Sequence, residues 1–326
     1  SLTGLAAAEG VSPFHLSRAF TLSLGRSPMA YVKARRLTEA ARVLDAVRPH
    51  GAVCVAETAH DALWAHLDLT HAFFNGTCVF PAVVGQEDIP CQLEIMKPEK
   101  PVGKNWRVAT SMNRKGAEQY GFGSYVADDY AELIDHPVEI GELSIGEFEV
   151  RGVPHAIAIR GKTRADMARL CHDLHTICDH HMSFLGKPGD LDRYLFLLNA
   201  PGSGYGGLEH RWSSALICGR DNLPARGDEG VSEEYRTFLG LVSHEYFHLW
   251  NVKRMKPDVF TPFDLSQESH TNLLWVFEGI TSYYDDLALV RSGMIEMESY
   301  LELLGQTITR VNRSGGRRKQ SVADSS

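Results

Sequence analysis

The stretch Ser243-His244-Glu245-Tyr246-Phe247-His248-Leu249-Trp250-Asn251 contains the pattern His-Glu-x-x-His. On a helix, His244 and His248 lie one turn apart and project from the same face. Two imidazoles placed in this way can occupy two corners of a tetrahedral zinc site, and Glu245 beside them can act as general base. The alternative is a chance match on a buried amphipathic helix. A third ligand elsewhere in the chain would favour the metal.

A carboxylate on the next predicted helix is the preferred third ligand. Glu278 is flanked by apolar residues in the run WVFEGI, and a carboxylate buried in such surroundings is costly unless it is paired or binds a metal. His244, His248 and Glu278 would hold one Zn2+ and leave a fourth position for water. Asp285 and Asp286 lie at a more polar end of the same helix and are less favoured.

Hydrophobic periodicity divides the chain into three parts, which predicts an α+β multidomain fold. Residues 1–47 are expected to form short helices, 48–161 an antiparallel β region, and 162–326 a mainly helical domain. No apolar run reaches the roughly 18 residues that a membrane-spanning helix needs, so no membrane contact is expected. The six cysteines are scattered, which is typical of reduced thiols in a cytoplasmic protein.

Two other groups of histidines are expected to be structural. His60, His66 and His71 are spread along the β region, and each is expected to make local hydrogen bonds rather than to bind a metal. The helix predicted around residues 165–186 is rich in cysteine and histidine, but its cysteines fall on the apolar stripe. It is therefore interpreted as a core helix with polar histidines on its wet side.

The first 47 residues have the pattern of a helix-turn-helix, with residues 13–24 as the recognition helix. Residues 1–50 carry seven basic and three acidic side chains, whereas the whole chain has a net charge of -8. This basic beginning makes DNA a possible partner. The residues of the recognition helix that are candidates for DNA contact are His15, Ser17, Arg18 and Thr21.

The runs SPFHLSRAF and GRSPMAY within residues 1–44 resemble the first helix-turn-helix and linker helix of the AraC-type transcription regulators. The DNA-binding unit of that family has two such motifs, and no second motif follows residue 44. Two interpretations stay open: half of a DNA-binding unit, or a three-helix scaffold that binds no DNA.

A glycine-rich segment precedes Glu209 in the run PGSGYGGLE. A phosphate-binding loop would need a helix after the glycines, whereas the sequence here predicts a strand. Gly206 and Gly207 are therefore interpreted as positions where a substrate backbone can approach an edge strand closely.

The runs HEYFHLWNVKRMKP and WVFEGITSYYDDL, with DLTHAFFNGTCVF and YLFLLNAPGSGYGGLEHRWSSALICGRDNLP upstream, resemble the glycyl aminopeptidase family of gluzincin metallopeptidases, which carry a PDZ domain. The resemblance covers roughly residues 50–326. It implies a β-rich N-terminal domain followed by a thermolysin-like catalytic domain. It also implies that His244, His248 and Glu278 bind zinc and that Glu245 is the base.

The segment Gly206-Gly207-Leu208-Glu209-His210 is similar to the Gly-x-Met-Glu-Asn strand of related aminopeptidases. This similarity implies that Gly206, Gly207 and Glu209 bind the substrate, with Glu209 pairing with its free α-amine. The expected function is hydrolysis of the N-terminal peptide bond of peptides that begin with glycine or another small residue.

The chain departs from that family in three respects. It lacks the first portion of the β domain, a Tyr-x-Lys-Gly oxyanion motif and the PDZ domain, so a fusion or truncated catalytic domain is expected. Tyr283 and Tyr284 are expected to be packing residues rather than substitutes for the oxyanion donor. The alternative functions are an AraC-type DNA-binding regulator with a non-catalytic peptidase-like body, and a non-functional chimera.

Overall fold

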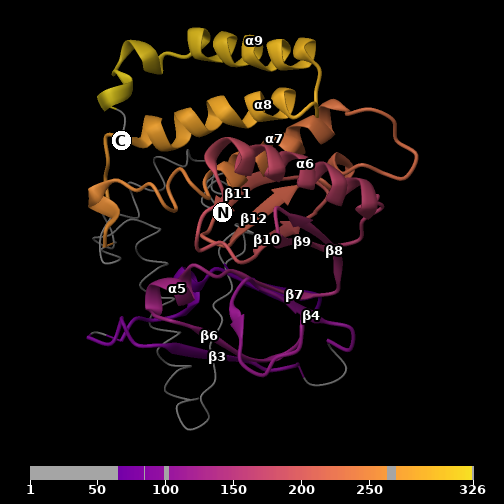
Figure 1. Cartoon of the computed structure of the whole chain (residues 1–326), viewed down its shortest axis with the longest axis vertical. Helices are drawn as coiled ribbons and strands as arrows, with labels where there is room; N and C mark the ends of the chain where they lie inside the picture. The colour runs from indigo at the N-terminus through magenta and orange to yellow at the C-terminus, as the bar shows by residue number, and fades with distance from the viewer. Residues whose placement is uncertain (1–64, 84, 99–102, 263–268, 325–326) are drawn as a thin grey trace, which may run out of the picture.

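The computed structural model describes residues 65–83, 85–98, 103–262 and 269–324. In this part, three β-sheets and a set of helices are stacked in layers (Figure 1). The predicted helix-turn-helix of residues 1–47, with His15, Ser17, Arg18 and Thr21, lies outside the described residues, as does His60. Among the described helices, none combines the length and apolar character needed to cross a membrane.

Two antiparallel sheets form the first part of the fold, which confirms the predicted antiparallel β region. A four-stranded sheet has the order β1-β2-β7-β4, and a three-stranded sheet has the order β3-β6-β5. The strands are β1 Ala65–Leu67, β2 His71–Phe74, β3 Cys91–Ile95, β4 Arg107–Ala109, β5 Asn113–Arg114, β6 Gly123–Ala127 and β7 Val138–Gly141, with two short helices, α4 Gly76–Val79 and α5 Tyr130–Ile134.

The four-stranded sheet is covered on both faces, and two neighbouring phenylalanines of β2 show how. Successive side chains of a strand point to opposite faces of its sheet. Phe74 packs into the core between the two antiparallel sheets, beside Leu93 and Tyr125. Phe73 packs into a different core, which faces a third sheet and contains Leu195. Every residue of β2 is therefore buried.

The third sheet has five strands in the order β11-β12-β10-β9-β8. Its central strand β10 is parallel to β9 and β12, whereas β8 and β11 pair antiparallel at the two edges. The strands are β8 Leu143–Val150, β9 Val153–Arg160, β10 Tyr194–Asn199, β11 Tyr205–Glu209 and β12 Ser213–Cys218. Strands β8 and β9 thus pair with the later part of the chain, although periodicity grouped them with residues 48–161. Alternating strands look alike in sequence whichever sheet they join.

Helices cover the other face of the five-stranded sheet (Figure 1). The predicted helices are α6 Met167–Leu185, α7 Glu233–Phe247, α8 Ile280–Arg291 and α9 Met297–Arg313. Helix α7 begins at Ser232, whose hydroxyl accepts a hydrogen bond from the backbone N–H of Tyr235, and two glutamates lie in its first turn. Both features stabilise a helix N-terminus. The histidine-rich helix α6 contributes Leu174, Ile177 and Cys178 to the core, in agreement with its predicted apolar stripe.

Two buried histidines fasten α7 to its surroundings. Nε2 of His155, on β9, lies 2.9 Å from the hydroxyl of Tyr246. Nε2 of His181, on α6, lies 2.9 Å from Oγ of Ser243, and that hydroxyl donates to the backbone carbonyl of Asp285 at 2.8 Å. Because the hydroxyl has a single proton, His181 must donate to it. These contacts hold the helix that carries the His-Glu-x-x-His pattern on both sides.

Glu139 of β7 predicts a pH dependence of stability. Its side chain is 2% exposed, and burial raises its pKa from 4.5 to about 8, against the opposing effect of Arg160. Between these pH values the folded state binds more protons than the unfolded state, so the stability falls as the pH rises. A Glu139→Gln variant should lack this loss, and its stability relative to wild type should increase by up to about 1 kcal/mol per pH unit.

Urea unfolding from about pH 5 to about pH 8 measures this difference. Glu149→Gln, which changes an exposed glutamate of β8, the next strand along the chain, is the matched control and should follow wild type. Parallel pH profiles for Glu139→Gln and wild type would show that Glu139 is ionised in the fold.

Candidate active site

The three expected metal ligands come together from two helical segments. His244 lies in the last turn of α7 and His248 is the residue that caps the C-terminus of this helix, with ring centroids 4.8 Å apart. Glu278 comes from a π-helical turn, Trp275–Gly279, that leads into α8. Its Oε2 lies 3.4 Å from Nε2 of His244, and its Oε1 lies 3.8 Å from Nε2 of His248. Two ligands of a tetrahedral zinc ion with bonds of about 2.0–2.1 Å lie about 3.3 Å apart. The first distance matches this value and the second is longer, so a small movement of Glu278 toward His248 would complete the zinc site.

The outer nitrogens of both imidazoles are already bound. Nδ1 of His244 lies 2.9 Å from Oδ2 of Asp285, and Nδ1 of His248 lies 2.9 Å from the backbone carbonyl oxygen of Asn251. In the neutral form of each imidazole, donating the Nδ1 proton to these oxygens leaves the lone pair on Nε2, facing Glu278. Metal-binding histidines generally have such a partner, because it fixes the tautomer and the ring orientation.

Asp285 is the functional residue that the sequence reasoning missed, since it was considered only as a rival ligand. A signal for it was present, because residues seven apart on a helix lie on the same face, and Asp285 follows Glu278 by seven. Asn251 was also missed. Its side-chain amide donates to the backbone carbonyl of Val276 at 3.0 Å and thereby connects the end of α7 to the turn that carries Glu278.

The expected burial of Glu278 is wrong. Its side chain is 51% exposed, and that of Trp275 in the same turn is also exposed, whereas Phe277 between them is buried. Apolar neighbours in sequence lie on different faces of a helical turn, so they do not by themselves bury the carboxylate. Glu278 lies at the rim of the site, with a lowered pKa that comes first from its hydrogen bond with His244.

Glu245 is the buried acid of the site. It is 5% exposed, and among the described residues its Oε2 atom has no hydrogen-bond partner. Burial, followed by the nearby negative charge of Glu209, raises its pKa to about 8. The pKa of His244 is raised to about 10 because its contacts with Asp285 and Glu278 outweigh the effect of burial. A buried carboxylate oxygen without a partner, in so negative a field, suits a place that receives a cation and a water.

Strand β11 brings the predicted substrate-binding residues to the same place. Gly206 and Gly207 lie within this edge strand, and Glu209 is its last residue. Carboxylate oxygens of Glu209 and Glu245 and a ring nitrogen of His248 lie within 4.8 Å of one another. A Cβ atom at Gly207 would lie only 2.0 Å from Oε1 of Glu245. The glycine therefore makes room for the buried acid, a reason that the sequence did not reveal.

An ion pair connects the N-terminal part of the fold to the segments that directly follow β11 and α7. Asp135, which follows α5, accepts from Nζ of Lys253 at 2.7 Å and from the backbone N–H of Arg211 at 2.8 Å, and lies 3.2 Å from Nδ1 of His210. Lys253 belongs to the segment directly after α7. The contact therefore connects the strand that carries Glu209 to the segment leaving the metal-binding helix.

Tyr283 and Tyr284 differ in their surroundings. The ring of Tyr284 stacks on Phe247 with centroids 5.4 Å apart, which agrees with the expected packing role. Tyr283 is 55% exposed, with its ring edge-on to Tyr284.

Two regions of the chain match models of known protein families. Residues 54–142 match the Peptidase M61 N-terminal domain, and residues 237–326 match the M61 glycyl aminopeptidase. The first match ends where β8 begins the five-stranded sheet, and the second contains His244, Glu245, His248 and Glu278. The described fold thus carries regions of the M61 peptidases. Neither match reaches residues 1–53.

A solved structure of a related protein is also similar to this chain. The crystal structure of an aminopeptidase N family protein from Idiomarina loihiensis is 43% identical in sequence and superposes with a TM-score of 0.79. The similarity covers 82% of this chain and 46% of that chain, so this chain spans about half the length of that relative. Curated proteins give no match.

The short distance between Gly207 and Glu245 makes a specific prediction. A Gly207→Ala variant should fold normally but displace Glu245, because the new methyl group would overlap the carboxylate. Peptidase activity is expected to fall about 100-fold or more, as for other displacements of about 1 Å in an active site. Gly202→Ala, in the loop before β11 with open space around the glycine, should keep its activity. Equal activity of both variants would contradict the geometry.

Asp285 leads to a prediction about metal affinity. Asp285→Asn should weaken zinc binding about 10- to 100-fold, because the charge that supports His244 as a ligand is lost. Competition with a fluorescent zinc chelator measures the change. Asp286→Asn, one residue further along α8, is the matched control and should bind zinc like wild type. Loss of affinity in both variants alike would indicate a general charge effect instead.

Proposed function

We propose that this chain is a zinc metallo-aminopeptidase that removes an N-terminal glycine or another small residue from peptides with a free N-terminus. One observation carries the proposal. The Nε2 atoms of His244 and His248 face the carboxylate of Glu278, and a carboxylate oxygen of the buried Glu245 lies within 4.8 Å of a ring nitrogen of His248. Oε2 of Glu245 has no hydrogen-bond partner among the described residues. The match to M61 peptidases supports the class of reaction.

The residues divide the chemistry between them. His244, His248 and Glu278 would hold the zinc ion, which when bound lowers the pKa of a water and polarises a carbonyl group. Glu245 accepts the proton of the attacking water on its free carboxylate oxygen and passes it to the leaving amine. Its burial keeps the carboxylate poorly solvated, so that it is a stronger base than a glutamate in water.

Glu209 accounts for the restriction to the first peptide bond. Its carboxylate, at the end of β11, can pair with the ammonium group of a substrate. Because β11 is an edge strand, a peptide backbone can lie along its unpaired N–H and C=O groups. A substrate held in this way would present its first carbonyl to the ion. A larger first side chain would have to fit beside Glu245, which favours small residues.

The DNA-binding alternative rests on residues 1–47 and their charge alone. Binding through His15, Ser17, Arg18 and Thr21 stays a prediction from sequence, as does the cytoplasmic location. A gel shift that weakens with salt and disappears in Arg18→Ala would support it. No shift even at low salt would remove it.

Hydrolysis of glycine and alanine anilides tests the proposed function. Glu245→Gln should lose about 10²- to 10⁴-fold of the rate while keeping its zinc, since only the proton transfer is removed. An N-acetylated glycine anilide should not be cleaved, because it has no ammonium group for Glu209. If the wild-type protein binds one zinc ion tightly at this site but hydrolyses no substrate, the site binds zinc without catalysing hydrolysis. Unchanged turnover in Glu245→Gln would refute the role of this residue.

A further inference from the structure

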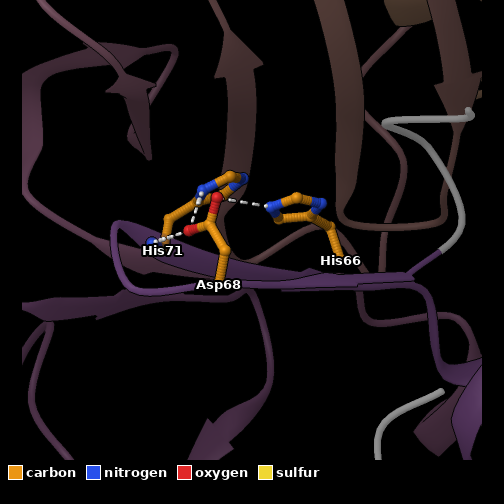
Figure 2. A group of neighbouring side chains, drawn as sticks. All are labelled: His66, Asp68 and His71. Atoms are coloured by element: carbon orange, nitrogen blue, oxygen red, sulfur yellow. Dashed lines mark hydrogen bonds and ion pairs between the residues drawn. The ribbon is translucent and has the colours of Figure 1, made fainter. Parts of the chain in front are cut away.

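A second group of metal-ligand side chains lies far from α7, on the hairpin formed by β1 and β2. His66 lies in β1, His71 begins β2, and Asp68 lies in the turn between them. Figure 2 shows the carboxylate of Asp68 in contact with both histidines. His66 pairs across the hairpin with Phe73, so its side chain is on the same face of the sheet as those of His71 and Phe73. The spacing of these three residues in the sequence did not show that their side chains lie together.

The turn itself uses only one oxygen of Asp68. Oδ1 accepts from the backbone N–H and the hydroxyl of Thr70, at 2.7 and 2.6 Å, and from the backbone N–H of His71 at 3.0 Å. These three hydrogen bonds account for the conformation of the hairpin. Oδ2 takes no part in them. The charge of the carboxylate and its second oxygen are therefore available for another role.

The distances among the three side chains suit a metal ion. Nε2 of His66 lies 3.1 Å from Oδ2 of Asp68, and Nδ1 of His71 lies 3.4 Å from Oδ1 of Asp68. Both values are close to the roughly 3.3 Å between two ligands of a tetrahedral zinc ion. Nδ1 of His71 also lies 3.1 Å from the hydroxyl of Thr70, a contact that a bound ion would replace. One ligand atom from each residue lies within 4.8 Å of the others. The rings stack with centroids 4.3 Å apart, so a modest tilt of His66 would let all three atoms converge.

Ordinary hydrogen bonding leaves one of these atoms unexplained. Nε2 of His66 is buried and, within the described part of the chain, has no hydrogen-bond partner although Oδ2 of Asp68 is close.

The group is also accessible from solvent. β1 is an edge strand of the four-stranded sheet, and the side chains of His66 and Asp68 are 31% and 43% exposed. His71 is 8% exposed and anchors the group from within. Two of the three side chains thus reach the surface, and a turn of the His66 ring would be needed to expose its buried Nε2 to an entering ion.

We propose that His66, Asp68 and His71 form a second metal site, which takes a divalent transition-metal ion such as zinc. Two imidazoles with one carboxylate are the ligands that such ions prefer over magnesium or calcium. Three protein ligands leave a fourth position for water or another group. An ion at this place would clamp the edge strand β1 to β2 and so stabilise the N-terminal sheets, independently of the proposed peptidase site.

Zinc stoichiometry of the full chain tests the proposal. After saturation with zinc and removal of the excess, wild type should retain two ions per chain by mass spectrometry, one in each separate ligand group. His66→Ala should retain one, His248→Ala should retain one, and the combined variant should retain none. His172→Ala, which removes an exposed histidine of α6 outside both groups, is the control and should retain two.

A more conservative substitution provides a second test if His66→Ala disturbs the fold of the hairpin. Asp68→Asn keeps an oxygen for the three hydrogen bonds of the turn but removes the charge. In the His248→Ala background it should weaken the remaining zinc site about tenfold or more, by calorimetric titration. The proposal is overturned if His248→Ala alone binds no zinc, or if neither change at the hairpin alters its zinc binding. Loss of zinc only with His248 changes would leave the proposed function standing without the second site.

Discussion

The arrangement of the site depends on how α7 and α8 are fastened to each other. Nδ1 of His244 contacts Asp285 of α8, and Oγ of Ser243, one residue earlier, donates to the backbone carbonyl of the same aspartate. Just beyond the same C-terminal end of α7, the side chain of Asn251 donates to the turn that carries Glu278. These polar contacts set the spacing between two imidazoles and a carboxylate that come from different helices. A metal site requires that spacing to within a few tenths of an ångström.

The β-sheets contribute further residues to the site and support its helices. The five-stranded sheet carries α7 on one face, and its edge strand β11 places Glu209 beside the buried Glu245. Gly207 lets strand and acid approach each other, since any side chain there would occupy the position of the carboxylate. The four-stranded sheet packs on the opposite face through Phe73, and Asp135 joins the two parts by its ion pair with Lys253. The N-terminal sheets are therefore part of the support for the site.

Much of the site could be predicted from local patterns. His-Glu-x-x-His on an amphipathic helix predicted that His244 and His248 lie close together, and the next helix was predicted to bring Glu278 to them; the structure places these three side chains together. The burial of Glu278 was predicted wrongly, because the faces of a π-helical turn cannot be assigned from sequence neighbours. Asp285 and Asn251 act through contacts between helices, which periodicity does not contain. Likewise, the strand pattern of residues 143–160 does not say which sheet they join, and the approach of His66 to Asp68 and His71 depends on the register of a hairpin.

The central claim is that His244, His248 and Glu278 together bind zinc. X-ray absorption at the zinc K edge of the His66→Ala variant tests it most directly, because that variant lacks the hairpin group. The account predicts a zinc shell of two imidazole nitrogens and light oxygen ligands at about 2.0–2.2 Å, with one imidazole lost in His248→Ala. A shell that contains sulfur at about 2.3 Å, or a His66→Ala protein that binds no zinc, would contradict it.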